Sequence, residues 1–217
     1  LSTSLEPIAE VHLKKMIHAI AHRGPDGERV WSNNNQSVLL GHRRLSIIDL
    51  SENAAQPMHY LNRYTIVHNG EIYNYIELKE FLTDKGYGFQ SQSDTEVILE
   101  AFIKKGVQSF ELLNGMFAFA IYDTQEEKIY LCRDRVGIKP LFYYFHENKF
   151  VFASEIKAIK KLINKKLEIN KQSFAEFLHI GFVSEPNTAF KDIYKFPAGN
   201  FLVLDVKKTS ANTKFHF

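Results

Sequence analysis

The pattern of apolar residues at the start of the chain predicts an amphipathic helix. Apolar side chains recur at the i, i+3, i+4, i+7 spacing of one helix face, at Leu13, Met16, Ile17 and Ile20. Pro7 suits the first helical turn, where a missing N–H is tolerated. We expect the helix to end before Gly24–Pro25, because the residue before a proline is pushed out of the α region.

Two more helices are predicted by capping residues followed by apolar stripes. Asn74 is placed to cap the first of them, and Gly86 is a suitable C-terminal stop. Ser93, with Glu96 three residues later, has the spacing of a capping box for the second, which ends at Gly106.

Short runs of β-branched, aromatic and alternating residues predict the strands, at 28–32, 37–42, 64–68, 116–123, 128–133, 141–145, 150–154 and 201–206. Turn residues separate the later runs closely, which is typical of antiparallel hairpins. Two short helices are expected before the closing strand. Helices combined with antiparallel strands, without regular βαβ alternation, predict an α+β fold.

Composition narrows the class of protein. The 217 residues are 45% hydrophobic and carry a net charge of +2, which favours one folded domain and gives no bulk reason to expect nucleic acid or an anionic membrane as a partner. No apolar stretch approaches the ~20 residues of a membrane helix, and the first residues do not resemble a signal peptide. The expected location is cytoplasmic.

Several potential chemical sites have simpler explanations. The sequence has no phosphate-binding loop of the GxxxxGK[ST] type and no HExxH. His18 and His22 are four residues apart, but no third metal ligand is nearby, so no metal site is predicted. Cys132 lies within an apolar run and is expected to be a small buried side chain. A basic run is expected to be a solvated helix face; it comprises Lys157, Lys160, Lys161, Lys165 and Lys166.

Four segments are more polar than packing requires, at residues 21–27, 41–49, 64–74 and 91–96. Each has a structural explanation of its own. The first can be a turn that stops a helix, and the second an edge strand with solvated arginines. The third can be a tight Asn–Gly hairpin, and the fourth a capped helix start.

Taken together, the four segments predict a site for an amino acid that undergoes acyl transfer. The planar guanidinium of an arginine at 43–44 suits bidentate capture of a carboxylate. The amide of Asn69 and the backbone N–H of Gly70 can together stabilise a developing oxyanion. A carboxylate at the predicted helix start in 91–96 can receive an ammonium group.

The motifs and their order resemble the glutaminase domain of glutamine-hydrolysing asparagine synthetases, which are class II glutamine amidotransferases. The matching segments are 22–26 (HRGPD), 44–49 (RLSIID), 67–74 (VHNGEIYN), 93–94 (SD), 115–120 (GMFAFA), 133–141 (RDRVGIKPL), 153–158 (ASEIKA) and 196–199 (FPAG). The resemblance covers nearly all of residues 9–206, and His-Arg-Gly-Pro-Asp with Asn-Gly-Glu-Ile-Tyr-Asn favours this family over other class II amidotransferases.

The resemblance implies a fold, a domain plan and a reaction. The fold is the four-layer αββα sandwich of the N-terminal nucleophile hydrolases. Residues 1–206 form the glutaminase domain without its first strand, and 207–217 begin a linker to a synthetase domain outside this sequence. Glutamine is hydrolysed to glutamate and ammonia for ATP-dependent synthesis of asparagine from aspartate. No cofactor is expected in this domain, and ATP and Mg²⁺ are expected in the synthetase domain.

The resemblance also assigns roles to individual residues. Arg44 binds the α-carboxylate of glutamine, and Asp94 binds its α-ammonium group with help from Glu71. Asn69 and Gly70 form the oxyanion hole. One wall of the pocket is formed, partly through the main chain, by Arg44, Leu45, Ser46, Ile47 and Ile48.

The nucleophile of the family is an N-terminal cysteine whose own α-amine, titrating near ~8, acts as the base. His22 and Arg23 are expected to support the residues around it. No cysteine precedes the first predicted helix, and Cys132 lies in a different part of the pattern. We therefore expect the sequence as written to bind glutamine without hydrolysing it.

Two alternatives stay open from the sequence. The domain could be a non-catalytic module that binds glutamine or another protein, or an amidotransferase that supplies ammonia to a different carboxylate. A homodimer is possible in either case.

Overall fold

A six-stranded antiparallel sheet forms the centre of the computed structural model, which describes residues 10–49, 51–84, 88–146, 149–163, 166–207 and 215–216. The strand order is β11-β10-β6-β5-β4-β3. The strands are β3 (Met58–Tyr60), β4 (Tyr64–Ile72), β5 (Gly115–Asp123), β6 (Lys128–Arg133), β10 (Phe201–Asp205) and β11 (Phe215–His216).

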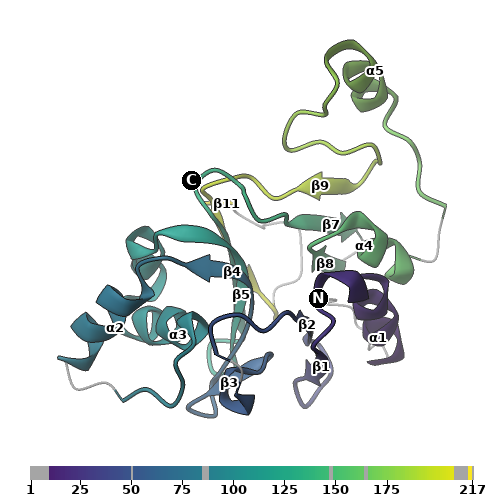
Figure 1. Cartoon of the computed structure of the whole chain (residues 1–217). Helices are drawn as coiled ribbons and strands as arrows, with labels where there is room; N and C mark the ends of the chain where they lie inside the picture. Colours follow the sequence, from purple (N-terminus) through teal and green to yellow (C-terminus); the bar gives the residue numbers. More distant parts are fainter. Residues whose placement is uncertain are drawn as a thin grey trace.

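A second β layer packs against one face of this sheet (Figure 1). It consists of the hairpin β1 (Gly27–Ser32) with β2 (Leu39–Arg44), and of a three-stranded sheet in the order β8-β7-β9. The strands of the latter are β7 (Phe142–His146), β8 (Lys149–Ala153) and β9 (Ile193–Lys195). Apolar side chains of both layers, such as Leu40, Leu131 and Phe150, form one core cluster.

Helices cover the outside of both β layers (Figure 1). α2 (Tyr75–Thr83) and α3 (Asp94–Lys105) lie on the outer side of the six-stranded sheet. α1 (Glu10–Ala19) packs against α4 (Ile156–Leu162) beside the second layer, and α5 (Lys171–Ile180) stands apart. Short 3₁₀ turns lie at Ala21–Arg23, Glu52–Ala54 and Gly106–Leu112. The layers therefore follow the order αββα.

Strand alternation divides the buried side chains between two cores. On β4, Val67 contributes to the core between the β layers, whereas Ile66 contributes to the core under α3. On β6, Leu131 and Cys132 divide in the same way. The prediction that Cys132 is a small buried residue is confirmed, since it is 5% exposed.

The segment around Asn69–Gly70 is not a hairpin turn. Both residues lie within β4, where Gly70 pairs with Phe117 of β5. Gly70 has φ +150°, and a Cβ there would meet the carbonyl oxygen of Met116 at 2.0 Å. Only glycine fits this close approach between β4 and β5. With glycine at position 70 the two strands can stay paired, and β4 continues four residues beyond the predicted strand 64–68, to Ile72.

The predicted helix starts are correct in position but partly wrong in their capping contacts. The Ser93 side chain accepts from the N–H of Thr95 at 3.2 Å, as expected of a cap. Glu96 does not complete the box, because its carboxylate accepts from the N–H groups of Gln90 and Ser91 at 2.7 Å. Asn74 makes no capping bond; its side chain instead bonds the chain at residues 112–114.

Three positions named in the predictions lie outside the described residues, and three short strands were not predicted. Pro7, Gly86 and Lys165 lie outside the described ranges. The short strands β3, β9 and β11 were not predicted, because runs of two or three residues carry little periodic signal. None of the helices in the described parts of the chain has the length and apolar character needed to span a membrane.

Candidate functional site

The polar segments singled out in the sequence meet at one open cavity of about 200 Å³. Residues 44–48 line one part of the cavity, which is called the wall below. Residues 69–71, near the end of β4, line another part, called the floor. Asp94 lines the cavity from the start of α3. The volume is below the roughly 300–1,000 Å³ of drug-sized pockets, so the cavity suits a small molecule such as a free amino acid. All nine residues predicted to contact the substrate line it.

Arg44 enters the cavity from the end of β2. One guanidinium N–H donates to the carbonyl oxygen of Asp49 at 2.5 Å, which fixes the side chain while other N–H groups stay available. The N–H of Ser46 donates to Asp26 at 2.8 Å, and this bond ties the wall to the segment 21–27. A fixed guanidinium at a small cavity is suited to a carboxylate ligand.

Asn69 presents an unused hydrogen-bond donor. Its side-chain nitrogen is buried and has no partner among the described residues. A buried amide without a partner costs about 1–3 kcal/mol, so such a group ordinarily binds an ordered water or a ligand. Its neighbour Gly70 also lines the cavity. The donor is therefore placed to meet an oxygen of a bound molecule.

Asp94 is an acidic residue that lines the cavity. It is 5% exposed, and one of its carboxylate oxygens accepts from the N–H of Ile72 at 2.9 Å. This bond joins the start of α3 to the end of β4, because Ile72 is the last residue of that strand. Glu71 lines the cavity beside it. The two acidic groups are suited to an ammonium group.

His22 and Arg23 are placed differently from each other. Arg23 lines the cavity, whereas His22 does not. Both contact Glu155, His22 through its Nε2 at 2.8 Å and Arg23 through its guanidinium at 3.4 Å. Burial alone would raise the pKa of Glu155, but hydrogen bonds from Lys157 and His22 outweigh it and lower the pKa. Sequence reasoning did not identify Glu155 as the partner of these residues.

A second, mostly apolar cavity adjoins the first. It is lined by residues of α1, β2, β4, β5 and β8, and it shares Arg23, His42 and Asn69 with the polar cavity. Among the described strands, β2 pairs only with β1 and β8 only with β7, so each has one unpaired edge. The slot between these edges therefore has the lining and the free backbone groups that another strand would need.

Lys139 and a histidine network were missed by sequence reasoning. Lys139 lines the polar cavity, and its backbone N–H donates to Asp134 at 2.9 Å. His68 contacts Thr95 through its Nδ1 at 3.1 Å, and its backbone N–H donates to the side chain of Gln56 at 2.5 Å. Lys139 and His68 lie within the segments 133–141 and 67–74 that carry the family resemblance, but only the fold shows that they lie at the site.

The described residues contain no group of three His, Cys, Asp or Glu side chains that could hold a metal ion. His18 is exposed on α1 and lines neither of the two cavities.

His42 makes the stability of the site depend on pH. Burial lowers its pKa from 6.5 to about 4, so in the folded state it stays neutral where an unfolded histidine is protonated. Protons therefore favour the unfolded chain, and stability should fall by about 3 kcal/mol as pH decreases from 6.5 to 4. Urea unfolding at several pH values should show a smaller decrease for His42→Gln than for the wild type. An unchanged decrease in His42→Gln would contradict this, and His18→Gln serves as the exposed control.

Cys132 should be unreactive in the folded protein. Burial raises the pKa of its thiol, and only the thiolate reacts with alkylating agents. We expect iodoacetamide to modify Cys132 at least ~100-fold more slowly in the native protein than in urea. Mass spectrometry of the labelled peptide measures both rates, and equally rapid labelling of the native protein would contradict a buried, unreactive thiol.

Comparison with known proteins places these features in context. The family of glutamine amidotransferase domains matches residues 3–216. The putative asparagine synthetase [glutamine-hydrolyzing] 2 of Methanocaldococcus jannaschii is 39% identical over 97% of this chain and 44% of its own length. Asparagine synthetase [glutamine-hydrolyzing] 1 of Bacillus subtilis is 41% identical over 87% of this chain and 29% of its own length. The chain thus spans less than half of these relatives.

The fold is shared with a more distant solved structure. Glutamine phosphoribosylpyrophosphate amidotransferase from B. subtilis matches with a TM-score of 0.70 and 19% identity, over 97% of this chain and 47% of that chain. At this identity the likeness shows the fold alone. Together with the αββα order of layers, it confirms the predicted α+β sandwich of the N-terminal nucleophile hydrolase type.

Proposed function

Because this chain belongs to the family of glutamine amidotransferase domains, we propose that its polar cavity binds free glutamine for hydrolysis to glutamate and ammonia. The observation that carries the proposal is the buried, unpartnered amide nitrogen of Asn69 in a cavity that has Arg44 on one side and Asp94 on another. A free amino acid has the two charges that these residues match, and glutamine adds a carbonyl oxygen for the amide of Asn69.

The proposed pose assigns one contact to each group of the substrate. Arg44 binds the α-carboxylate, and Asp94 with Glu71 binds the α-ammonium group. The side chain of glutamine then extends along β4 toward Asn69 and Gly70. In this pose its amide oxygen accepts from the donors that stabilise negative charge when the carbon is attacked.

We propose that the nucleophile is a cysteine on a segment that precedes Leu1 in the full-length protein. The apolar slot between the free edges of β2 and β8 supports this, because it adjoins the polar cavity at Asn69 and can accept a strand. The α-amine of this cysteine would take the proton of the thiol, and the resulting thiolate would attack the amide carbon of glutamine to form a tetrahedral oxyanion. The α-ammonium group then gives that proton to the amide nitrogen, so the C–N bond breaks, ammonia departs and a thioester forms. Water then cleaves the thioester to glutamate and the free thiol.

The relatives support asparagine synthesis as the use of this ammonia. We propose that a linked synthetase domain, with ATP and Mg²⁺, activates aspartate as the acceptor. The cytoplasmic location, the homodimer and the linker at 207–217 stay predictions. The alternative acceptor also stays open, because the cavity described here contacts only the ammonia donor.

Glutamine turnover by the full-length protein tests the proposal. We expect glutamate and ammonia in equal amounts, and loss of both when the proposed N-terminal cysteine is replaced by alanine. Calorimetric binding of glutamine without release of ammonia by the unmodified protein would favour the non-catalytic module instead. Ammonia release that persists in the cysteine variant would contradict the assigned nucleophile.

A further inference from the structure

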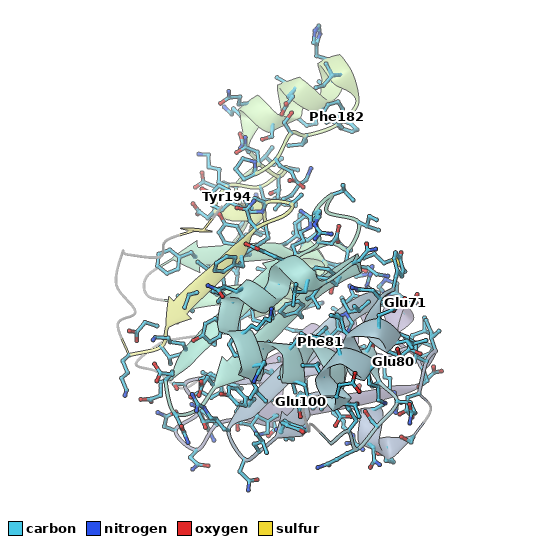
Figure 2. All side chains as sticks on the ribbon, turned by 90° about the vertical axis from the view of Figure 1, so that its left-hand side faces the viewer. Glu71, Glu80, Phe81, Glu100, Phe182 and Tyr194 are labelled. Carbon is cyan, nitrogen blue, oxygen red and sulfur yellow. The ribbon has the colours of Figure 1, made fainter. Side chains whose placement is uncertain are left out.

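α5 is a well-formed helix that stands away from the two β layers (Figures 1 and 2). Asn170 caps its start by accepting from the N–H of Ser173 at 3.2 Å, and Gly181 ends it with φ 81°. Ser173 is the only buried residue of the helix. The helix therefore has a capping residue at each end, although the rest of the domain covers little of its surface.

The side chains on α5 are unusually apolar for a solvated surface. Phe174, Phe177 and Leu178 have the i, i+3, i+4 spacing of one helix face and are 52%, 50% and 70% exposed. Ile180 and Phe182, which is labelled in Figure 2, are also exposed. Together these five residues, called the α5 face below, expose on the order of 400 Å² of side-chain surface, and exposed apolar patches of this size are often functional.

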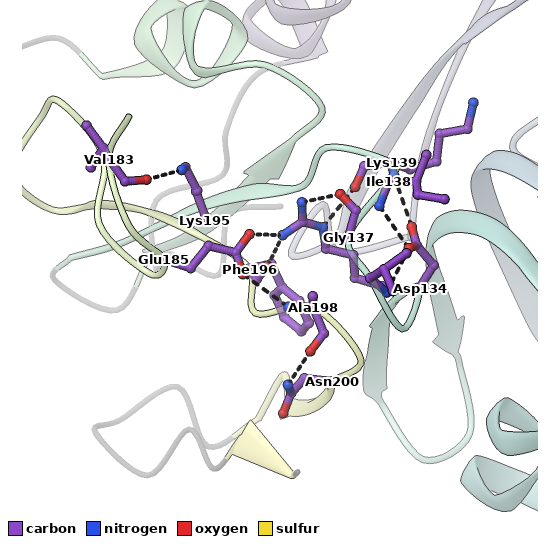
Figure 3. Close-up of polar contacts among 12 residues, drawn as sticks. Asp134, Gly137, Ile138, Lys139, Val183, Glu185, Lys195, Phe196, Ala198 and Asn200 are labelled. Atoms are coloured by element: carbon purple, nitrogen blue, oxygen red, sulfur yellow. Dashed lines mark hydrogen bonds and ion pairs between the residues drawn. The ribbon is translucent and has the colours of Figure 1, made fainter. Parts of the chain in front are cut away.

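The segment that follows α5 is held to the body of the domain by a polar cluster (Figure 3). Ser184, just after the helix, donates its hydroxyl to Glu176 at 2.5 Å. Glu185 forms an ion pair with Arg133 at 2.8 Å, and Arg133 is 7% exposed. The chain that follows α5 is therefore anchored at a buried guanidinium.

The same guanidinium holds the loop at the edge of the glutamine cavity. Arg133 donates to the carbonyl oxygens of Gly137 and Lys139, each at 2.8 Å. Asp134 accepts from the N–H groups of Ile138 and Lys139 at 2.8 and 2.9 Å. Since Lys139 lines the cavity, Arg133 connects the segment that follows α5, through Glu185, to the loop at the edge of the glutamine site.

We propose that the α5 face docks on the domain that follows this chain in the full-length protein. The relatives leave more than half of their length outside this match, since the chain spans 44% and 29% of them. A second copy fits less well, because a stable dimer buries roughly 800 Å² per partner and the α5 face offers about half of that. A covalently linked domain needs less surface, because the linkage raises its effective concentration.

The consequence for catalysis rests on the proposed function. Docking on α5 places the linked domain at a fixed position relative to Lys139 and the glutamine cavity, through the Arg133 cluster. Ammonia released in the cavity is then formed next to the linked domain, which can consume it.

Photo-crosslinking of the full-length protein tests the docking directly. Benzoylphenylalanine at position 178 is expected to crosslink within one polypeptide to peptides beyond residue 217. The same probe at Ile76, which is 53% exposed on α2, is the control and should give no such product. Crosslinks between two polypeptides, or none at all from position 178, would overturn the proposal. This readout does not require glutamine hydrolysis, so it separates the failure of docking from the failure of the proposed function.

A double variant, Phe177→Ser with Leu178→Ser, tests the consequence. We expect glutamate release to persist while the amidated product formed per glutamate falls at least tenfold. The matched control Ile76→Ser should keep the wild-type ratio. Wild-type coupling in a folded double variant would refute the role of the α5 face, and product formation with added ammonium salt shows that the second active site is intact.

Discussion

Replacing Asn69 with alanine is expected to lower kcat for glutamine hydrolysis by about 10²–10³-fold, with a much smaller effect on KM. The reason is that its buried amide has no partner among the described residues and is placed to donate mainly when the carbonyl oxygen of glutamine gains negative charge. Steady-state kinetics of the full-length protein, with ammonia as the readout, measures both constants.

Asn35→Ala is the matched control for this experiment, because Asn35 is exposed in the loop between β1 and β2. Its kinetic constants should equal those of the wild type. If Asn69→Ala instead raised KM and left kcat unchanged, Asn69 would contact the substrate equally in the ground state and the oxyanion role would be wrong.

Replacing Arg44 with glutamine is expected to raise KM for glutamine by about 100- to 1,000-fold. This change in KM corresponds to about 3–4 kcal/mol, which is the loss of two charge-assisted hydrogen bonds to the α-carboxylate at the low end of their range of about 1.5–3 kcal/mol each. The bond from Arg44 to the carbonyl oxygen of Asp49 shows that the side chain is already held at the cavity before substrate binds.

The control is Arg29→Gln, which removes a charge of the same kind from the exposed strand β1. It should change KM less than threefold, because surface charges away from the site contribute little. A similar KM for Arg44→Gln and the wild type would show that the α-carboxylate is bound elsewhere.

Much of the site was predictable because the relevant segments are contiguous in sequence. The wall 44–48 and the floor 69–71 each come from one strand and its continuation, and Asp94 sits at a helix start that Ser93 marks as a cap. The residue types of the four segments taken together suggested carboxylate, oxyanion and ammonium binding, and the family resemblance then assigned these roles to Arg44, Asn69 with Gly70, and Asp94.

The remaining features depend on contacts between distant segments. Asn–Gly suggested a turn, but Gly70 is there because β5 approaches β4 too closely for a Cβ. Glu96 fits a capping box in spacing, yet the loop at residues 90–91 lies close enough to take its carboxylate. Lys139 reaches the cavity only through a loop that Asp134 and Arg133 shape.

α5 shows a different limit of prediction from sequence periodicity. A helix before the closing strand was expected, and its apolar residues would ordinarily indicate a buried face. The structure leaves them exposed, because the chain after α5 returns to Arg133 without covering the helix. Periodicity identifies an apolar face but not what covers it.

The most direct measurement is calorimetric binding of glutamine and two derivatives to the full-length protein with its proposed N-terminal cysteine replaced by alanine. N-acetylglutamine removes the positive end of the molecule, and glutaminamide removes the negative end. We predict that each derivative binds at least 100-fold more weakly than glutamine, and that Arg44→Gln abolishes the discrimination against glutaminamide alone. Equal binding of all three ligands would contradict a cavity that recognises both ends of a free amino acid.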